Sequence, residues 1–527
     1  MEFDLFGRPG ISRRESLVLG GGAGAALLLG PRALGAAGDP FALGVASGDP
    51  WPDGFVIWTR VTRDPLAADG NGGMTGPVEV RYEVAEDQAM KRVVRKGAAR
   101  ADATFAHSVH VELAGLQSGR DYFYRFETLG AQSPVGRART APAPGAKVDK
   151  LKLAFASCAH YEVGFFSAYR HMAEEHPDVV FFLGDYIYEY SYMGAREAEL
   201  PRKHDYRPDL MTLGQYRNRY ALHKLDADLQ ALHTAATQIA TWDDHEVQND
   251  YSGTWSNDPK DPPEVFAKRQ RAAYQAFYEH MPLRRRKIPT ATDMRIYDRY
   301  RFGDLAEITV PDERQYRTIQ PCPLPDTRRG HVAPLSCPDL EATDRTMLGF
   351  EQERWMYEGF RNPHAKWNII AQQLLVAPLD QLTPDNKWGR FTENWSGYGA
   401  NRRRMVSAMD MAKLNNAVFF GGDMHCFMTT DIKADDLDQK SRVVAAEFVG
   451  TSITSDAPAR ALAVNMPYNP QVRLFETRYR GYMTAEVTPG RLDVNYRIIS
   501  DRTKKDATVS TFKKYVVEDG KAGAQDA

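Results

Sequence analysis

Side chains that can bind metal ions follow four mainly apolar runs of the sequence, each at the point where the run ends. The runs and the residues that follow them are 151–157 with Cys158, 179–184 with Asp185, 238–242 with Asp244, and 417–422 with Asp423. Short continuous apolar runs predict strands that are buried on both faces, as in parallel sheets. Because ligand sites in open α/β sheets lie at the carboxyl ends of the strands, we expect these side chains to converge.

More metal-binding side chains lie shortly after three of these run ends. They are Tyr188, His245, Asn249 and His425. Carboxylates brought together without a cation repel and raise each other's pKa, so bound metal ions are the simplest explanation. The mixture of thiolate, phenolate, imidazole and carboxylate suits iron, and surplus oxygen ligands suit a harder ion such as calcium. Two adjacent metals can clamp both the attacking and the leaving oxygens in phosphoryl displacement.

Each of these residues has a simpler interpretation when it is taken alone. A buried cysteine such as Cys158 most often packs as a small apolar residue. An aspartate after a strand is often the N-cap of the next helix. Tyr188, taken alone, is typical of core packing, and His425, taken alone, of a buried histidine with satisfied hydrogen bonds. The repetition of the arrangement at four run ends favours a shared metal site.

Two arginines follow a fifth apolar run, residues 305–310. Arg314 and Arg317 could form a fork that binds phosphate oxygens, or they could form a structural ion pair, and both alternatives stay open. The basic run 284–287 is interpreted as a solvated face. Three aromatic residues could line the rim of a pocket, although core or loop packing is more common. They are Trp388, Trp395 and Tyr398.

The stretch 39–145 contains short alternating runs with turn residues between them. These runs are residues 54–60, 78–84, 108–113 and 122–126. Alternation with period two and this spacing predict an immunoglobulin-like β-sandwich domain. Residues 141–146, Ala-Pro-Ala-Pro-Gly-Ala, are typical of a linker.

After residue 150 the apolar runs alternate with stretches of helical pattern. These stretches are residues 165–175, 264–279, 349–361 and 402–414. The alternation predicts a largely parallel α/β sheet layered with helices, in a catalytic domain that covers residues 150–510. Residues 511–527 are expected to form a loose polar tail.

Composition places the chain among soluble globular proteins. Of its 527 residues, 43% are apolar and 26% are charged. A chain of this length is too long for a single compact core. The net charge is −2, and the pI is about 6.7. This balance lacks the basic excess of nucleic-acid-binding proteins, so no nucleic-acid site is predicted.

Residues 1–37 resemble a twin-arginine export signal. Arg13 and Arg14 precede an apolar stretch, residues 17–29, which is short for a membrane span of roughly 20 residues. We expect export by the twin-arginine machinery, cleavage near residues 35–37, no transmembrane span in the mature chain, and a periplasmic or secreted location. An uncleaved anchor is the alternative.

Two of the four cysteines, Cys322 and Cys337, flank a polar, proline-rich segment. In an exported protein we expect them to form a disulfide, and two free thiols are the alternative.

The motifs around these residues resemble the PhoD-like family of secreted alkaline phosphatases and phosphodiesterases. The matching stretches are 41–50 (FALGVASGDP), 155–158 (FASC), 183–188 (LGDYIY), 241–247 (TWDDHEV), 314–317 (RQYR), 422–425 (GDMH) and 447–452 (EFVGTS). The family is similar to the purple acid phosphatases. The resemblance implies a four-layer αββα metallophosphoesterase core preceded by the immunoglobulin-like β-sandwich.

The resemblance also implies the metals and their ligands. Fe(III) would be held by Cys158, Asp185, Tyr188 and His425. A neighbouring Ca²⁺ would be held by Asp185, Asp244 and Asp423, so that Asp185 bridges the two ions. Asn249 and Asp250 are weaker candidates for a further Ca²⁺. The family often has Asn where Asp250 stands, which leaves the outer ligands open.

The function implied is that of an exported metal-dependent phosphoesterase of the alkaline phosphatase D type. It would hydrolyse phosphate mono- and diesters through attack of a metal-activated hydroxide on phosphorus. Arg314, His160 or His245 would balance charge or protonate the leaving group. A phospholipase D-type phosphodiesterase on the same scaffold is one alternative. A non-catalytic, metal-stabilised surface binding module is another, although clustered acids suit an open metal site better than a closed structural one.

Overall fold

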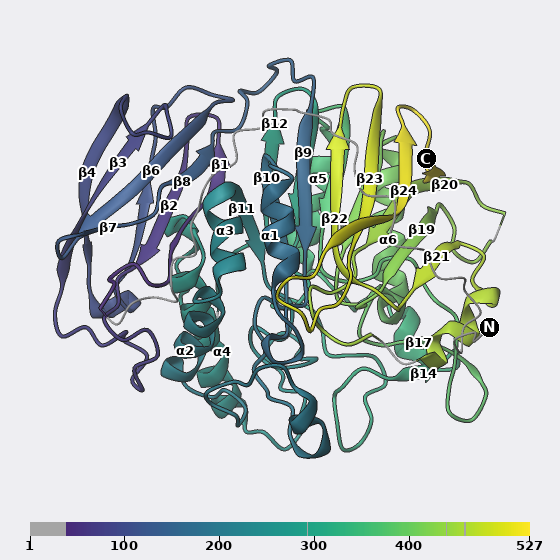
Figure 1. Cartoon of the computed structure of the whole chain (residues 1–527). Coiled ribbons are helices and arrows are strands. Elements are labelled where there is room, and N and C mark those ends of the chain that lie inside the picture. The colour runs from purple at the N-terminus through teal and green to yellow at the C-terminus, as the bar shows by residue number, and fades with distance from the viewer. Residues whose placement is uncertain (1–37, 292, 439, 458–459) are drawn as a thin grey trace, which may run out of the picture. The chain divides into compact units, whose positions relative to one another are not determined.

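The computed structural model describes residues 38–527, apart from residues 292, 439 and 458–459, so the predicted export signal lies outside the described residues. Most strands of the described chain belong to two large sheets (Figure 1). The ten-stranded sheet has the order β25 (Gln525–Asp526), β24 (Val509–Glu518), β23 (Arg491–Ile499), β22 (Arg480–Val487), β9 (Leu151–Ala156), β10 (Val179–Leu183), β11 (Thr237–Thr241), β1 (Val45–Trp51), β2 (Gly54–Arg60), β5 (Ser108–Glu112). The seven-stranded sheet has the order β12 (Asp298–Phe302), β13 (Ala306–Val310), β15 (Trp367–Ala371), β18 (Ala417–Gly421), β20 (Val443–Val449), β19 (Phe427–Lys433), β21 (Val472–Glu476).

Both large sheets are parallel at the centre and antiparallel at the edges. Strands β9, β10, β11 and β1 pair in parallel, as do β13, β15, β18 and β20. The strands outside these groups pair antiparallel. The five strands predicted from apolar runs are confirmed, and all of them lie in the parallel centres. The sequence pattern revealed the fully buried central strands but not their division between two sheets.

The two large sheets pack face to face. Successive residues of a strand point to opposite faces, so each central strand contributes to two cores. Phe155 and Phe181 of the ten-stranded sheet face Phe420 of the seven-stranded sheet, and the rings of Phe155 and Phe420 are stacked 4.0 Å apart between centroids. The next residues along the strands, Ala156 and Phe182, pack instead with helices.

Helices cover the outer faces of the two sheets. A core on the ten-stranded sheet includes residues of α1 (Ser167–Glu174), α2 (Leu213–Lys224), α3 (Ala227–Ala235) and α4 (Pro263–His280). A separate core on the seven-stranded sheet includes residues of α5 (Phe350–Arg361) and α6 (Gly399–Met411). The four predicted helical stretches correspond to α1, α4, α5 and α6. Short 3₁₀ helices span Ala103–Phe105, Tyr161–Val163, Gly194–Glu199, Arg285–Lys287, Pro338–Glu341, Trp395–Tyr398 and Arg460–Tyr468.

Local sequence signals fix several helix starts. Thr212 and Gln215 form a capping box at the start of α2. The carboxylate of Asp226 accepts hydrogen bonds from the amides of Asp228 and Leu229 at the start of α3. Pro263 occupies the first turn of α4, where a missing N–H costs nothing.

The N-terminal strands fall into two sheets packed on each other. A five-stranded sheet contains β4 (Val93–Ala101), β3 (Val78–Ala85), β6 (Asp121–Thr128), β7 (Ala131–Gln132) and β8 (Gly136–Arg139). It shares one apolar core with β1, β2 and β5, and Figure 1 shows these purple and blue strands side by side. All four runs predicted in this region are strands. Strand β1 also pairs in parallel with β11, so the second half of this sandwich is continuous with the ten-stranded sheet.

The loose tail expected for residues 511–527 is wrong. Strand β24 pairs with β23, and β25 pairs with β24. Tyr515 and Val517 are buried in the core between the two large sheets. The segment is polar overall because the alternate side chains of β24 face solvent, so its mean composition concealed a half-buried strand.

The basic run 284–287 is solvated only in part. Lys287 is 2% exposed, and its ammonium lies 2.8 Å from a carboxylate oxygen of Asp49. Arg285 and Arg286 are exposed, as predicted. Among the three aromatic candidates, Trp395 and Tyr398 are buried in the core beside the seven-stranded sheet, whereas Trp388 is 37% exposed.

The predicted disulfide between Cys322 and Cys337 is confirmed. The loop it closes contains β14 (Val332–Pro334), which pairs with β17 (Trp388–Phe391), and β17 pairs with β16 (Gln381–Leu382). Cys426 is a buried core residue beside the seven-stranded sheet. Within the described residues, no helix is both long enough and apolar enough to cross a membrane.

Candidate metal centre

The predicted ligands lie in loops at the carboxyl ends of four central strands, β9, β10 and β11 in one sheet and β18 in the other. Two glycines allow these loops to approach closely. A Cβ atom on Gly184 would lie 2.4 Å from the Cβ of Asp243, and one on Gly422 would lie 2.7 Å from Ser157 Oγ. Because any side chain at these positions would clash, glycine is what brings the β10 loop to β11 and the β18 loop to β9.

Four candidate ligands adopt left-handed backbone conformations. The φ angles are 62° for Cys158, 52° for Asp185, 59° for Asp423 and 50° for His425. Residues other than glycine seldom adopt positive φ, and such conformations cluster at functional sites where the surrounding structure enforces them. Three of the four, Cys158, Asp185 and His425, bring their ligand atoms within 4.8 Å of one another, whereas Asp423 belongs to none of the ligand groups among the described residues.

The first ligand group consists of Cys158, Asp185 and His425, whose ligand atoms all lie within 4.8 Å of one another. Tyr188 joins them, because its hydroxyl donates to Asp185 Oδ2 at 2.9 Å and lies 3.2 Å from His425 Nε2. Asp185 Oδ1 is buried and has no hydrogen-bond partner among the described residues. A buried carboxylate oxygen without a partner is costly, and a cation would satisfy it. The four side chains therefore fit a metal ion.

The protonation of the two softer ligands supports the same fit. Burial, with the charge of Asp185, raises the pKa of both the Cys158 thiol and the Tyr188 phenol well above their usual values. Neither group would ionise near neutral pH by itself. A bound cation deprotonates such ligands by stabilising the anion.

The imidazole of His425 is held by its other nitrogen. Nδ1 lies 2.6 Å from the carbonyl oxygen of Asp456, which can accept its proton. This contact leaves Nε2 facing Tyr188 and Asp185. Metal-binding histidines are commonly oriented in this way by a carbonyl. The side chain of Asp456 is itself fixed by Arg196 and Arg502.

A second ligand group shares Asp185 with the first. The ligand atoms of Asp185, Asp244 and His245 lie within 4.8 Å of one another, and a further group consists of Asp244, Asp250 and Glu393. Asp423 is half-buried nearby, and burial together with Asp244 and Asp185 raises its pKa to about 8, although Arg314 opposes this shift. Acids in such mutual repulsion fit a second cation.

Asn249 lies at the edge of this second group. Its backbone N–H donates to Glu189 at 2.7 Å, and its carbonyl accepts from Asn257 at 2.7 Å. These two bonds fix the backbone next to Asp250.

The two arginines after β13 are buried in ion pairs. Arg314 pairs with Asp243 and Glu393 and lies 3.5 Å from Asp244, and Arg317 pairs with Glu393. Both side chains are fully buried. The geometry favours the structural ion pair over an open phosphate fork, and it places one cationic group among the acids.

The two histidine candidates differ in their environments. His160 is buried beside the Tyr188 ring at 4.5 Å between centroids, and burial lowers its pKa well below the ordinary value. Its Nε2 atom has no hydrogen-bond partner in the described part of the chain. His245 Nδ1 lies 2.7 Å from Glu189 Oε2. Burial lowers the pKa of His245, but Asp244 and Glu189 outweigh burial and raise it well above the ordinary value. Of the two, only His245 has a raised pKa, which favours its protonated form.

Several residues of the site were not singled out from the sequence. Glu246 accepts the backbone N–H groups of Asp185, Tyr186 and Asp243, so one carboxylate holds two strand ends together. Glu189 holds His245, and Glu393 holds both buried arginines. Glu246 was detectable as part of the motif at 241–247, and Glu189 directly follows Tyr188. No local pattern marks Glu393.

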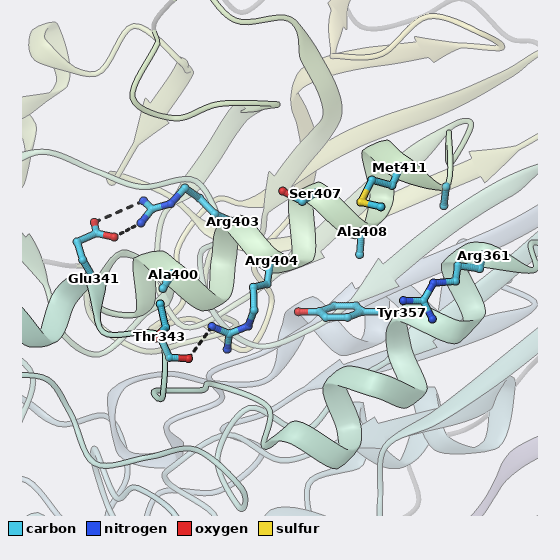
Figure 2. Close-up of a pocket in the computed structure, with 11 residues that line it drawn as sticks. Glu341, Thr343, Tyr357, Arg361, Ala400, Arg403, Arg404, Ser407, Ala408 and Met411 are labelled. Carbon is cyan, nitrogen blue, oxygen red and sulfur yellow. Dashed lines mark hydrogen bonds and ion pairs between the residues drawn. The ribbon is translucent and has the colours of Figure 1, made fainter.

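A separate cavity lies outside the candidate ligand groups. It has a volume of about 750 Å³ and lies between α5 and α6 (Figure 2). Apolar side chains and arginines line it, among them Tyr357, Arg361, Arg404 and Met411. None of the candidate ligands within the described residues lines this cavity.

The chain is similar to known proteins over most of its length. The model of the PhoD-like phosphatase family matches residues 153–496, and the model of that family's N-terminal domain matches residues 30–142. The chain belongs to the PhoD-like phosphatase family, and it is a phosphoric ester hydrolase.

A curated relative is alkaline phosphatase D of Bacillus subtilis strain 168. It is 41% identical over 492 residues, which cover 92% of this chain and 82% of the relative. A solved structure of PhoD matches with a TM-score of 0.85 at 40% identity, covering 93% of this chain and 92% of that chain.

Proposed function

We propose that this phosphoric ester hydrolase uses two neighbouring metal ions to hydrolyse phosphate mono- and diesters. Cys158, Asp185, Tyr188 and His425 would hold Fe(III), and Asp185, Asp244 and Asp423 would hold Ca²⁺, with Asn249 and Asp250 near a further Ca²⁺. The observation that carries the proposal is the position of Asp185. It belongs to both ligand groups and has one buried carboxylate oxygen without a partner among the described residues.

Bound metals would activate water near neutral pH and offset the negative charge of the phosphate. The protein supplies the positioning. Glu246 accepts hydrogen bonds from the backbone N–H groups of Asp185 and Asp243, and Arg314 balances part of the acidic charge. His245, held by Glu189, is the candidate that donates a proton to the leaving-group oxygen, because Asp244 and Glu189 raise its pKa and it lies beside the acids of the second ligand group.

The proposal also covers the layered architecture of the catalytic region, the N-terminal sandwich and the cellular location of the protein. The helix, sheet, sheet and helix cores support a four-layer αββα catalytic fold, and the shared core of the N-terminal sheets supports an immunoglobulin-like sandwich. The arginine pair in residues 1–37 and the disulfide support export by the twin-arginine route to the periplasm or medium. N-terminal sequencing of the exported protein tests this, and retention of Met1 would contradict it.

The central test replaces Asp185 by Asn in the mature chain. Loss of one negative charge shared by both ligand groups should lower kcat/KM for a phosphoester on the order of 10²-fold or more. The fold, measured by circular dichroism, should persist. The matched control is Asp64→Asn, which makes the same change on the exposed surface. Near-normal turnover by Asp185→Asn would refute the bridging role.

Substrate class is decided by comparing kcat/KM for a monoester, a nucleotide diester and a phospholipid. Activity on the first two supports the proposal. A strong preference for the phospholipid would favour the phospholipase D-type alternative on the same scaffold. Metal binding without turnover of any of the three would favour the binding module.

A further inference from the structure

The loop closed by the Cys322–Cys337 disulfide contacts the outer edge of the candidate metal centre. The backbone N–H of Gly330, inside the loop, donates to Asp250 Oδ2 at 3.0 Å. Just before the loop, Gln320 Nε2 donates to the carbonyl of Asp250 at 2.5 Å. Asp250 is therefore held on its side chain and on its backbone by segments that the disulfide joins.

Asp250 in turn holds a candidate metal ligand. Its backbone N–H donates to Asp244 Oδ2 at 2.6 Å. Asp244 belongs to two of the candidate ligand groups, one with Asp185 and His245 and the other with Asp250 and Glu393. A continuous chain of hydrogen bonds thus leads from Gly330 through Asp250 to the carboxylate of Asp244.

The loop makes a second contact with the same region. The N–H of Arg328 donates to the carbonyl of Asn257 at 2.7 Å, and the Asn257 side chain donates to the carbonyl of Asn249 at 2.7 Å. Gly330 also packs tightly, because a Cβ atom there would lie 2.8 Å from the Cβ of Glu393. The loop therefore contacts Asp250 and Glu393 directly and reaches Asn249 through Asn257.

Few apolar contacts hold this loop in place. The buried apolar cluster at the disulfide contains Ala333 and Cys337 of the loop and Leu340 just after it, with Cys322 packed against them. Leu324 and Leu335 are 45% and 54% exposed. A segment with so little buried apolar surface opens easily, and a covalent closure restricts it strongly.

We propose that the Cys322–Cys337 disulfide is a positioning element for the metal centre, which keeps Gly330 and Gln320 on Asp250 and thereby fixes Asp244. This inference rests on the proposed metal-dependent function. Reduction of this disulfide by a small dithiol would free the segments that hold Asp250. The S–S bond breaks and two thiols form, while the dithiol supplies two electrons and two protons and becomes a disulfide.

The test compares the mature parent chain with the double variant C322S/C337S. The Ca²⁺ concentration for half-maximal phosphoesterase activity should rise on the order of tenfold to a hundredfold, as when outer partners of metal ligands are lost. In the metal-free proteins, hydrogen exchange should become faster in peptides covering residues 247–257 and 320–337. Dithiol treatment of the metal-free parent should reproduce that increase and should leave C322S/C337S unchanged.

The control for general destabilisation is Val80→Ala, in the apolar core of the N-terminal sheets. It should lower the melting temperature without changing the Ca²⁺ requirement or exchange at 247–257. The inference is overturned if C322S/C337S keeps the parent's Ca²⁺ requirement and the parent's exchange at 247–257. Should the parent hydrolyse no phosphoester, the proposed function fails, but exchange at 247–257 still decides whether the disulfide holds Asp250. If C322S/C337S does not fold, the dithiol-treated parent supplies the same comparison.

Discussion

Tyr188 carries the sharpest consequence of the proposed iron site at the scale of single residues. Its phenol lies between Asp185 and His425, and Ser455 Oγ donates to it at 2.7 Å. Burial and Asp185 raise its pKa well above the ordinary value, so it is a neutral phenol in the metal-free protein. Only a strongly charged cation would make it a phenolate.

We expect the purified protein to absorb visible light through charge transfer from the Tyr188 phenolate to Fe(III), and the Tyr188→Phe variant to lose or strongly shift the band. The matched control is Tyr190→Phe, whose ring lies 5.8 Å from that of Tyr188 between centroids and should leave the band unchanged. Absorption spectra with elemental analysis check this. An active, colourless protein without iron would refute the iron assignment.

The pairing of Glu189 with His245 predicts a dependence on the leaving group. In Glu189→Gln the pKa of His245 should fall, because a carboxylate 2.7 Å from Nδ1 is replaced by a neutral amide. For an alkyl phosphate, kcat/KM should drop on the order of 10²-fold, whereas a nitrophenyl ester with a good leaving group should lose much less.

The pH profile gives the sign of this effect. A proton donor with a raised pKa is active below that pKa and is lost as pH rises through it, so the alkaline limb of Glu189→Gln should move to lower pH. Glu279→Gln, which removes a buried carboxylate paired with Arg217, is the control and should leave the limb in place. Equal losses on both esters would contradict a proton-donor role.

At the scale of elements, helix α2 ends in a buried lysine. Lys224 is fully buried, and its ammonium nitrogen has no hydrogen-bond partner within the described chain. It lies 4.4 Å from the ring centroid of Trp58, on strand β2. Burial lowers its pKa to about 7. Above about pH 7 the helix therefore ends in a group that is mainly neutral in the folded protein but charged in the unfolded chain.

This lysine should make stability rise with pH. Between about pH 7 and 10.5 the unfolded chain binds a proton that the folded chain does not, so the free energy of unfolding increases over that window. Lys224→Met should flatten the increase and should raise stability at pH 7, by up to about 5 kcal/mol. Urea denaturation at several pH values measures it. Lys268→Met, at an exposed site of α4, should leave the pH dependence unchanged.

At the scale of the whole molecule, a buried polar cluster of Asp49, Lys287 and Tyr300 joins strand β1 to β12 at the edge of the seven-stranded sheet. Asp49 lies on β1. Its carboxylate accepts hydrogen bonds from the Lys287 ammonium at 2.8 Å and from the hydroxyl of Tyr300, on β12, at 2.5 Å. Together with the parallel pairing of β1 and β11, this contact makes the N-terminal region part of one structure with the catalytic region.

Asp49→Ala should therefore destabilise the protein by about 3–5 kcal/mol, because it leaves the Lys287 ammonium buried and unpaired. Adding Lys287→Met should recover much of the loss. Glu79→Ala, which breaks the exposed pair with Arg81, should cost no more than about 1 kcal/mol. Thermal denaturation of the three variants checks this, and equal losses for Asp49→Ala and Glu79→Ala would contradict it.

Much of the fold and the site could be predicted because their signals are local. Phe181 and Phe182 lie in an apolar run that predicts a strand buried on both faces, and the residue types after such runs predicted Cys158, Asp185 and His425 as neighbours. The same reasoning failed for β24, since Tyr515 and Val517 alternate with polar residues in a segment judged by its average composition.

The sequence by itself therefore predicted the strands with clear apolar or alternating runs, the helices α1, α4, α5 and α6, the disulfide pair and the convergence of Cys158, Asp185 and His425, because each depends on residues close together or on a recurrent motif. Tertiary structure decided that Arg314 is buried against Glu393, 79 residues away, and that Lys287 pairs with Asp49, 238 residues away. It also divided the strands between two sheets. Such contacts depend on how whole elements pack, and because many distant partners suit the same side chain, only the assembled core selects one of them.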